Sequence, residues 1–406
     1  MNAFCAALFL QAGYNAALVA IGAALLGVSA GVAGTFLFLR RRALVSDAVA
    51  HATLPGIGLA FLLMVAMGGD GRSLFGLLLG SLLSALVGLL AIEWLVRRTR
   101  LAEDAAIGAV LSVFFGFGIV LLTVIQSLST GRAAGLESFL LGSTAGMLLA
   151  DAVLIAGGGA FTTLLVVALR RPMTLVTFDA EFAAATGIDV RRTDRLVMGL
   201  VTLVTVIGLK IVGLVLIVAL LIIPTVAARF WTERTSLLLA ISGAIGGLSA
   251  FVGAALSASA PALPTGPVIV LVCAALFTVS MILAPERGVL AAVLRRRSFA
   301  RRVHRRQGLL ALARGEPIHD PLTVRILIVE GLMRPDGVAT PLGERRAARA
   351  ARDERRWSEL RRMYRDEAIG RYDGLTAIED VLAADEIALI DRRLASRPPI
   401  LVPDPV

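Results

Sequence analysis

The sequence predicts an all-α polytopic membrane protein that ends in a small charged domain. Of its 406 residues 57% are hydrophobic, and the mean hydropathy is +0.83, which is more apolar than soluble domains usually are. Charged residues are sparse before about residue 285 and dense after it. We therefore expect a transmembrane domain at residues 1–288 and a cytoplasmic domain at residues 289–406.

A helix needs roughly 20 mostly apolar residues to cross a bilayer. Eight stretches meet this requirement: 15–39, 44–67, 73–96, 105–126, 138–170, 196–228, 236–257 and 266–284. The stretches 138–170 and 196–228 are each long enough for a second helix. The pattern therefore predicts eight or nine transmembrane helices.

Arginine clusters predict which side of the membrane each end occupies, because cytoplasmic loops carry an excess of Lys and Arg. The clusters lie at 40–42, 97–100, 170–171, 191–195 and 295–306. They predict a multi-pass membrane protein with its C-terminal domain in the cytoplasm. If the spans alternate, the first cluster places the N-terminus outside, which favours nine.

The stretch "SDAVAHATLP" places Asp47 and His51 four residues apart, on one face of an otherwise apolar helix. An Asp near the bilayer centre costs about 2.5–3.5 kcal/mol on insertion scales. Carboxylate oxygen and imidazole nitrogen suit Mn(II), Fe(II) and Zn(II), so the pair is a candidate metal or proton site. An interhelical hydrogen-bonded pair explains the spacing equally well. Two ligands are too few for a closed site, so others must come from another helix or a second copy of this one.

Two further residues are candidates for a gate or a helix break. Pro55, followed by Gly56 and Gly58, is expected to kink or loosen the helix beyond His51. Lys210 is the only lysine and an isolated charge in an apolar run, where it could snorkel or mark a break between two helices. Because Ile211 follows it, the chain has no Gly-Lys-Ser/Thr loop for ATP. We expect a non-catalytic subunit.

Several segments resemble the permease subunits of bacterial ABC transporters for zinc, manganese and iron. "RRRALVSDAVAHATLPGIGLAFLL" (40–63) is similar to the second span of that family, and "EDAAIGAVLSVFFGFGIVLL" (103–122) to a middle span. "ESFLLGS" (137–143) is similar to a short region that follows, and 178–230 to the loop and paired helices that face the ATPase. The resemblance covers residues 15–285.

The resemblance implies import of a divalent transition metal, which is the substrate; no permanently bound cofactor is expected. It also implies three partners: a second permease subunit, a separate cytoplasmic ATP-binding subunit and an extracytoplasmic metal-binding protein. The pathway aspartate and histidine of the family correspond to Asp47 and His51.

The resemblance further implies that the segment from Asp179 to Arg195 couples the permease to its ATPase. The residue pattern predicts a short helix that ends at a glycine, because an acidic start and an Ala-rich turn precede Gly187. A plain cytoplasmic loop is the alternative. The coupling candidates are Asp179, Glu181, Gly187, Asp189, Arg191 and Arg192.

The C-terminal residues look like a degenerate winged helix of the diphtheria-toxin-repressor type. After a basic helix from about residue 290 we expect a helix ending in Glu330-Gly331-Leu332, a hairpin around Pro335-Asp336-Gly337 and a long helix after Gly343. Because the recognition helix has only one basic residue, Arg325, we expect packing, ATPase contact or metal sensing rather than DNA binding. The resemblance to manganese and iron regulators favours those metals over zinc.

Two other functions remain compatible with the sequence. One is a secondary transporter that exchanges metal for protons at Asp47 and His51 and needs no ATPase. The other is a membrane-tethered, metal-dependent regulator whose C-terminal domain binds DNA.

Overall fold

The computed structural model describes residues 3–69, 71, 73–127, 147–260, 263–363 and 375–396. The chain divides into two compact units, Met1–Ala291 and Ala292–Val406. The segment 137–143, which resembles the permease family, lies outside the described residues.

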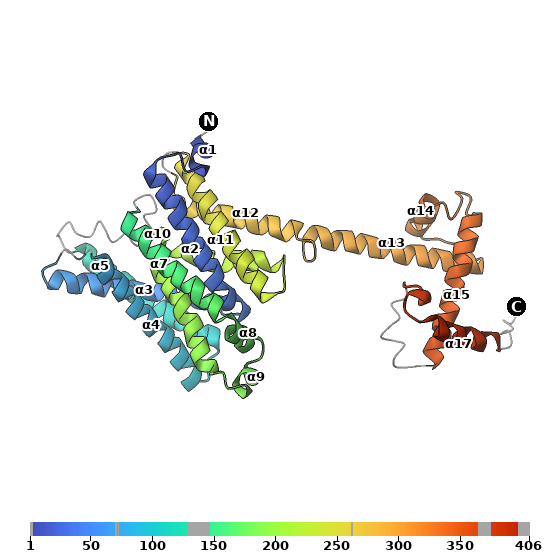
Figure 1. The fold of residues 1–406 in the computed structure, drawn as a ribbon, viewed down its shortest axis with the longest axis horizontal. Coiled ribbons are helices and arrows are strands. Elements are labelled where there is room, and N and C mark those ends of the chain that lie inside the picture. Colours follow the sequence, from blue (N-terminus) through green and yellow to red (C-terminus); the bar gives the residue numbers. More distant parts are fainter. Residues whose placement is uncertain are drawn as a thin grey trace. The chain divides into compact units, whose positions relative to one another are not determined.

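The first unit is a bundle of helices (Figure 1). In chain order they are α1 (Ala3–Leu8), α2 (Tyr14–Leu39), α3 (Ala43–Ala66), α4 (Leu74–Arg98), α5 (Glu103–Ser127), α7 (Leu149–Ala168), α8 (Arg170–Phe178), α9 (Ala180–Ala185), α10 (Val190–Arg229), α11 (Thr235–Ala258) and α12 (Thr265–Leu283).

Among the described residues, seven helices are long and apolar enough to cross a membrane: α2, α3, α4, α5, α7, α11 and α12. The structure thus shows about seven such helices, and the prediction of eight or nine goes beyond that number. The predicted stretch 196–228 lies within α10, which is interrupted and whose part Leu216–Arg229 is a shorter apolar helix.

The two candidate helix breaks differ in outcome. Helix α3 continues through Pro55 to Ala66. In α10 the backbone is helical at Lys210, and the interruption lies at Gly213, where φ is 77° and ψ is 171°. Only glycine adopts such angles readily, so the break follows the glycine rather than the lysine.

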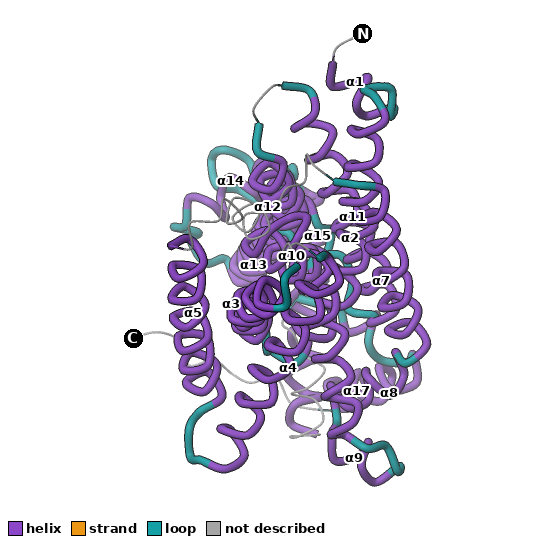
Figure 2. The backbone as a smooth tube through the Cα atoms, turned by 90° about the vertical axis from the view of Figure 1, so that its left-hand side faces the viewer, coloured by secondary structure: helices purple, strands orange, loops and turns teal. Residues whose placement is uncertain are grey.

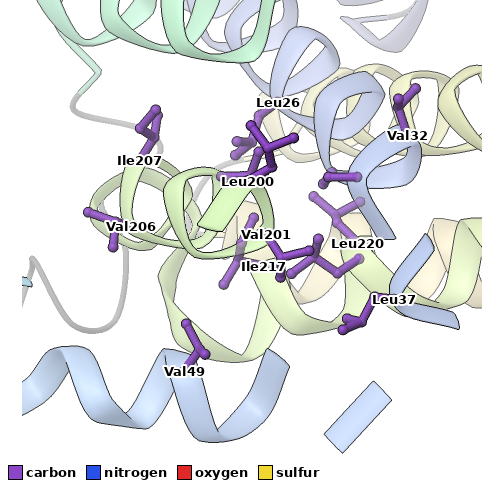
Figure 3. Close-up of a cluster of buried hydrophobic side chains, with 14 of the residues drawn as sticks. Leu26, Val32, Leu37, Val49, Leu200, Val201, Val206, Ile207, Ile217 and Leu220 are labelled. Carbon is purple, nitrogen blue, oxygen red and sulfur yellow. The ribbon is translucent and has the colours of Figure 1, made fainter. Parts of the chain in front are cut away.

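Helix α2 lies at the centre of the core and packs against α7, α10 and α11. Figure 3 shows its Leu26 and Leu37 among side chains of α10 such as Leu200, Ile217 and Leu220. Small residues allow this approach, since a Cβ added at Gly27 would lie 2.2 Å from the carbonyl oxygen of Gly246. Gly76 and Gly80 in α4 differ in this respect: Gly80 faces the backbone of Gly56, whereas Gly76 faces the side chain of Met64.

The ends of the first unit are chemically different. Figures 1 and 2 both place α1 at one end of the bundle and α8 and α9 at the other. The start of α8 carries the arginines of the 170–171 cluster, and the start of α10 carries those of the 191–195 cluster. The charged residues discussed below therefore gather at the α9 end.

The second unit has the helices α13 (Val289–Arg314, from Ala292 on), α14 (Pro321–Val329), α15 (Pro341–Met363) and α17 (Ala384–Ala395), with a 3₁₀ turn at Ile378–Asp380. One small core surrounds Leu327, and another surrounds the fully buried Trp357. The expected order of helix, turn and long helix is present. Its turn has only an isolated bridge between Met333 and Ala339, and no strand occurs in the described part of the chain (Figure 2). A winged helix is therefore not established.

Candidate functional site

Asp47 and His51 lie one turn apart near the start of α3, as the four-residue spacing predicts. The Nε2 atom of His51 is 3.5 Å from Oδ1 of Asp47, and the side chains are 20% and 41% exposed, respectively. The neighbouring residues Ser46, Ala48 and Ala50 are buried. The pair therefore occupies the less covered side of a helix that is otherwise packed into the bundle.

The distance suits a shared metal ion. Two ligand bonds of about 2.1 Å place their donor atoms 3.5 Å apart when they meet at an angle of about 113°, close to the tetrahedral value. No third His, Cys, Asp or Glu joins them, because the described residues contain no group of three or more such side chains that could hold a metal ion. Asp47 and His51 can thus form one half of a metal site.

The imidazole ring of His51 contacts an aromatic ring, but one of its nitrogen atoms has no hydrogen-bond partner among the described residues. The ring of Phe115 from α5 meets it edge to face, with centroids 4.9 Å apart and planes at 84°. Its Nδ1 atom is buried and has no hydrogen-bond partner among the described residues. Buried polar atoms are normally paired, so this histidine needs a further group to be satisfied.

Beyond the pair, the first unit has a large apolar cavity. It begins one turn past His51 at Pro55 and is an open hollow of about 710 Å³ between α3, α4 and α5. Its walls are almost entirely hydrocarbon, with Leu59 and Leu63 from α3 and Phe117 from α5. Pro55 therefore lies between the polar pair and an apolar space; a role as a gate stays a prediction. The side chain of Lys210 lies outside the described part, so its predicted role stays open as well.

At the α9 end, four charged side chains from four helices form one group, here called the Asp194 cluster: Arg40, Arg42, Glu103 and Asp194. Arg40 pairs with Oδ1 of Asp194, and the Nη1 atom of Arg42 lies 2.8 Å from Oδ2 of the same carboxylate. The Nε atom of Arg42 is 2.8 Å from Oε1 of Glu103. Sequence reasoning interpreted Arg40 and Arg42 only as markers of the cytoplasmic side, and nothing local in the sequence predicts their partners.

The predicted coupling segment forms a short helix between two caps. The carboxylate of Asp179 accepts a hydrogen bond of 2.8 Å from the backbone N–H of Phe182 and thereby caps the start of α9. Gly187 follows with φ of 85°, and the N–H groups of Gly187 and Ile188 each donate 3.0 Å bonds to the end of α9. The expected short helix with a glycine stop is present.

Asp189 starts the next helix in the same way. Its Oδ1 accepts a 3.0 Å hydrogen bond from the backbone N–H of Arg192, while the Arg192 guanidinium lies 3.0 Å from Oδ2. The backbone hydrogen bond, together with the nearby arginine charge, lowers the pKa of Asp189 below its ordinary value of 3.8. Glu181, Arg191 and Arg192 are exposed, so the segment presents both signs of charge.

Sequence reasoning missed two aromatic residues in this segment. Phe178 and Phe182 flank the capping Asp179 and are 64% and 55% exposed, respectively. Large apolar side chains exposed beside a polar segment mark interaction sites more often than single surface residues do. The four-residue spacing does not place them on one helix face, because the backbone leaves helical geometry at Asp179. The available signal was only the presence of two phenylalanines beside a charged segment.

Two membrane proteins of metal transport systems are similar to this chain. It is 43% identical over 298 residues to the manganese transport system membrane protein MntC of Bacillus subtilis, covering 73% of this chain and 67% of that protein. It is 42% identical over 284 residues to the zinc transport system membrane protein TroC of Treponema pallidum, covering 70% of this chain and 94% of that one.

A solved structure and a family model agree with these relatives. PsaBC from Streptococcus pneumoniae, solved in complex with a Fab, matches with a TM-score of 0.60 and 29% identity, over 68% of this chain and 95% of that one. Residues 14–284 match the model of the ABC 3 transport family, which spans all the candidate membrane helices and leaves the second unit outside. The resemblance of the membrane domain to permease subunits is thus confirmed, and this chain belongs to the ABC 3 transport family.

Proposed function

We propose that this chain is the membrane permease subunit of an ABC importer for divalent transition metal ions. The observation that carries the proposal is the Asp47–His51 pair, whose donor atoms lie 3.5 Å apart on a helix of the bundle. The names of the similar proteins, one for manganese and one for zinc, support this class of substrate. The chain itself is non-catalytic, and ATP is hydrolysed by a separate cytoplasmic subunit.

The donor set selects a class of metal rather than one ion. Oxygen and nitrogen ligands suit manganese, iron and zinc, whereas Cu(I) prefers thiolate and thioether sulfur. We propose manganese or iron as the substrate, with zinc as the alternative; the support is the sequence pattern of the C-terminal residues and the name of the manganese relative. The metal passes through as substrate.

A second permease subunit completes the site in this proposal. One chain supplies two donors, since no third His, Cys, Asp or Glu of the described residues joins them. A facing copy, or a similar subunit, would supply two more donors and make a four-ligand site. An extracytoplasmic binding protein delivers the metal to this dimer.

The α9 end is proposed to face the cytoplasm and the ATPase. Support comes from its arginines and from two exposed phenylalanines, Phe178 at the end of α8 and Phe182 on the capped helix α9. The N-terminus then lies outside in the bacterial inner membrane. The two parts of α10, on either side of Gly213, add two crossings to the seven, which gives nine, the number that an outside N-terminus favours over eight. The second unit lies in the cytoplasm as a winged-helix-like domain that packs, contacts the ATPase or senses metal.

The test is metal uptake by the complex with its ATPase in proteoliposomes. Asp47→Ala and His51→Ala are each expected to reduce uptake at least a hundredfold, because removal of one of two donors leaves the site incomplete, while assembly with the ATPase is unchanged. Asp104→Ala is the matched control, since Asp104 is an exposed acid in the first turn of α5, and it is expected to retain wild-type uptake.

Three outcomes would contradict the proposal. Normal uptake in both variants would show that the pair is structural. Uptake that persists without the ATPase would indicate a secondary, proton-coupled transporter instead. Sequence-specific DNA retention by the full chain in detergent, dependent on Mn(II), Fe(II) or Zn(II), would indicate a membrane-tethered regulator.

A further inference from the structure

The Asp194 cluster joins parts of the chain that are far apart in sequence. Asp194 is separated from Arg42 by 152 positions and from Arg40 by 154. Arg40 caps the end of α2, Arg42 caps the start of α3, and Glu103 is the first residue of α5. One carboxylate at the start of α10 therefore pairs with the arginines at the ends of α2 and α3, and Arg42 extends the connection to α5.

The backbone conformation of Arg41 indicates that the two flanking arginines are fixed in position. Arg41 has φ of 58°, a left-handed conformation that non-glycine residues rarely adopt. Such a conformation persists when the surrounding contacts determine it. Here the contacts are those of Arg40 and Arg42, which meet opposite oxygens of the Asp194 carboxylate.

The cluster is also partly removed from solvent. The side chains of Arg40 and Asp194 are 14% and 23% exposed, and those of Arg42 and Glu103 are 30% and 36% exposed. Ion pairs with this degree of burial are less screened than surface pairs. By contrast, the nearby pair Glu93–Arg97 joins two positions of α4 only and links no separate elements.

On one side the cluster is continuous with the coupling segment. Asp194 follows the capping residue Asp189 and the exposed Arg191 and Arg192 within the first turns of α10. Asp194 is itself part of the coupling segment 179–195. Movement of this segment therefore moves the Asp194 carboxylate with it.

On the other side the cluster is continuous with the metal pair. Arg42 begins α3, and His51 lies nine residues along that helix, or about 13 Å at 1.5 Å per residue. Glu103 begins α5, which carries the Phe115 ring that contacts His51. The start of α3 is thus attached to Asp194 directly through its N-cap Arg42, and the start of α5 is attached indirectly, because Glu103 pairs with Arg42.

We propose that Asp194 is a positioning residue that transmits movement of the coupling segment to α3 and α5, and so to Asp47 and His51. This inference rests on the proposed function, since it assumes an ATPase at the coupling segment and a metal at the pair. In the nucleotide cycle, α3 moves together with the start of α10 while the cluster is intact.

The first experiment measures metal taken up per ATP hydrolysed in proteoliposomes that contain the complete transporter. Asp194→Asn is expected to keep ATP hydrolysis within twofold of wild type and to lower metal uptake per ATP at least tenfold. Asp194→Glu, which keeps the charge, is expected to restore most of the ratio. Glu93→Gln removes the ion pair within α4 and is expected to leave the ratio within twofold.

A merely structural role gives a different result. Equal losses of ATP hydrolysis and uptake in Asp194→Asn, or a loss that Asp194→Glu does not restore, would overturn the inference. An unchanged ratio in Asp194→Asn would overturn it too.

The second experiment needs no metal and so separates this inference from the proposed function. Spin labels at Leu44→Cys on α3 and Ala184→Cys on α9, both exposed positions, report the distance between the metal helix and the coupling segment. With the cluster intact, this distance is expected to stay the same with and without ATP and vanadate, and to change or broaden in Asp194→Asn. The same behaviour in both proteins would overturn the inference, whereas absent uptake with the expected distances would overturn only the proposed metal import.

Discussion

Helix α2 passes so close to α10 that the carbonyl oxygen of Leu221 lies where a side chain at Gly34 would begin. A Cβ placed on Gly34 would be 1.8 Å from that oxygen and 2.7 Å from the carbonyl carbon. Both atoms belong to the backbone and cannot rotate away. We therefore expect Gly34→Ala to force α2 and α10 apart.

The size of the effect follows from these distances. Ordinary contact begins at 3.4 Å, so the two atoms must separate by a further 1.6 Å along the line that joins them. Overpacking of a core usually costs about 1–3 kcal/mol and occasionally more, and a rigid backbone contact lies at the upper end. Alanine recovers about 1 kcal/mol through its higher helix propensity, so a net loss of about 2 kcal/mol is expected.

A matched substitution removes the propensity term from the comparison. Gly157 in α7 is also helical, and a Cβ built there meets nothing within 4 Å, so Gly157→Ala gains propensity without a clash. Denaturant unfolding of the two purified variants in detergent is expected to differ by about 3 kcal/mol. Equal stability would refute the reasoning, since it would mean that α2 and α10 do not approach as closely as the structure shows.

Two further predictions concern the second unit and the coupling segment. Asp391→Asn removes a two-point contact of 2.7 and 2.8 Å with Arg356; because Asp391 is 45% exposed, we expect a loss of only about 0.5–1 kcal/mol. Hydrogen bonds from Arg356 hold the pKa of Asp391 below its ordinary value of 3.8, so the contribution is present at neutral pH and is lost as the pH falls below about 4. Amide hydrogen exchange of α17 in the full chain should therefore be about two- to fivefold faster in the variant at pH 7 and equal to wild type in acid. Replacing Phe178 and Phe182 together by Ala is expected to weaken binding of the ATPase at least tenfold, measured by co-purification and titration, with unchanged folding of the permease; unaltered binding would show that these side chains do not dock the ATPase.

Local features of the molecule could be predicted because their causes are local. Membrane helices are recognisable since a segment in lipid must satisfy its backbone hydrogen bonds internally, and the apolar stretches accordingly correspond to helices such as α2, α3 and α11. The Asp47–His51 contact and the short helix after Asp179 depend on residues within four positions of one another.

Features that join distant parts of the chain could not be predicted in this way. The partner of Arg42, the ring that contacts His51 and the carbonyl beside Gly34 all come from other helices. Hydrophobic periodicity does not specify which helices become neighbours, and in lipid this depends on close packing of small residues. The break in α10 is an intermediate case: the sequence indicated its region through Lys210, but the backbone placed it at Gly213.

The sequence by itself determined that this is a helical membrane protein of a metal-transporter type, with a polar pair in one helix and a capped short helix in another. Only the tertiary structure decided that the helix of the Asp47–His51 pair is joined to the coupling segment through the Asp194 carboxylate. The physical reason is that composition and spacing act within a helix, whereas an ion pair across 152 positions exists only after the helices have packed.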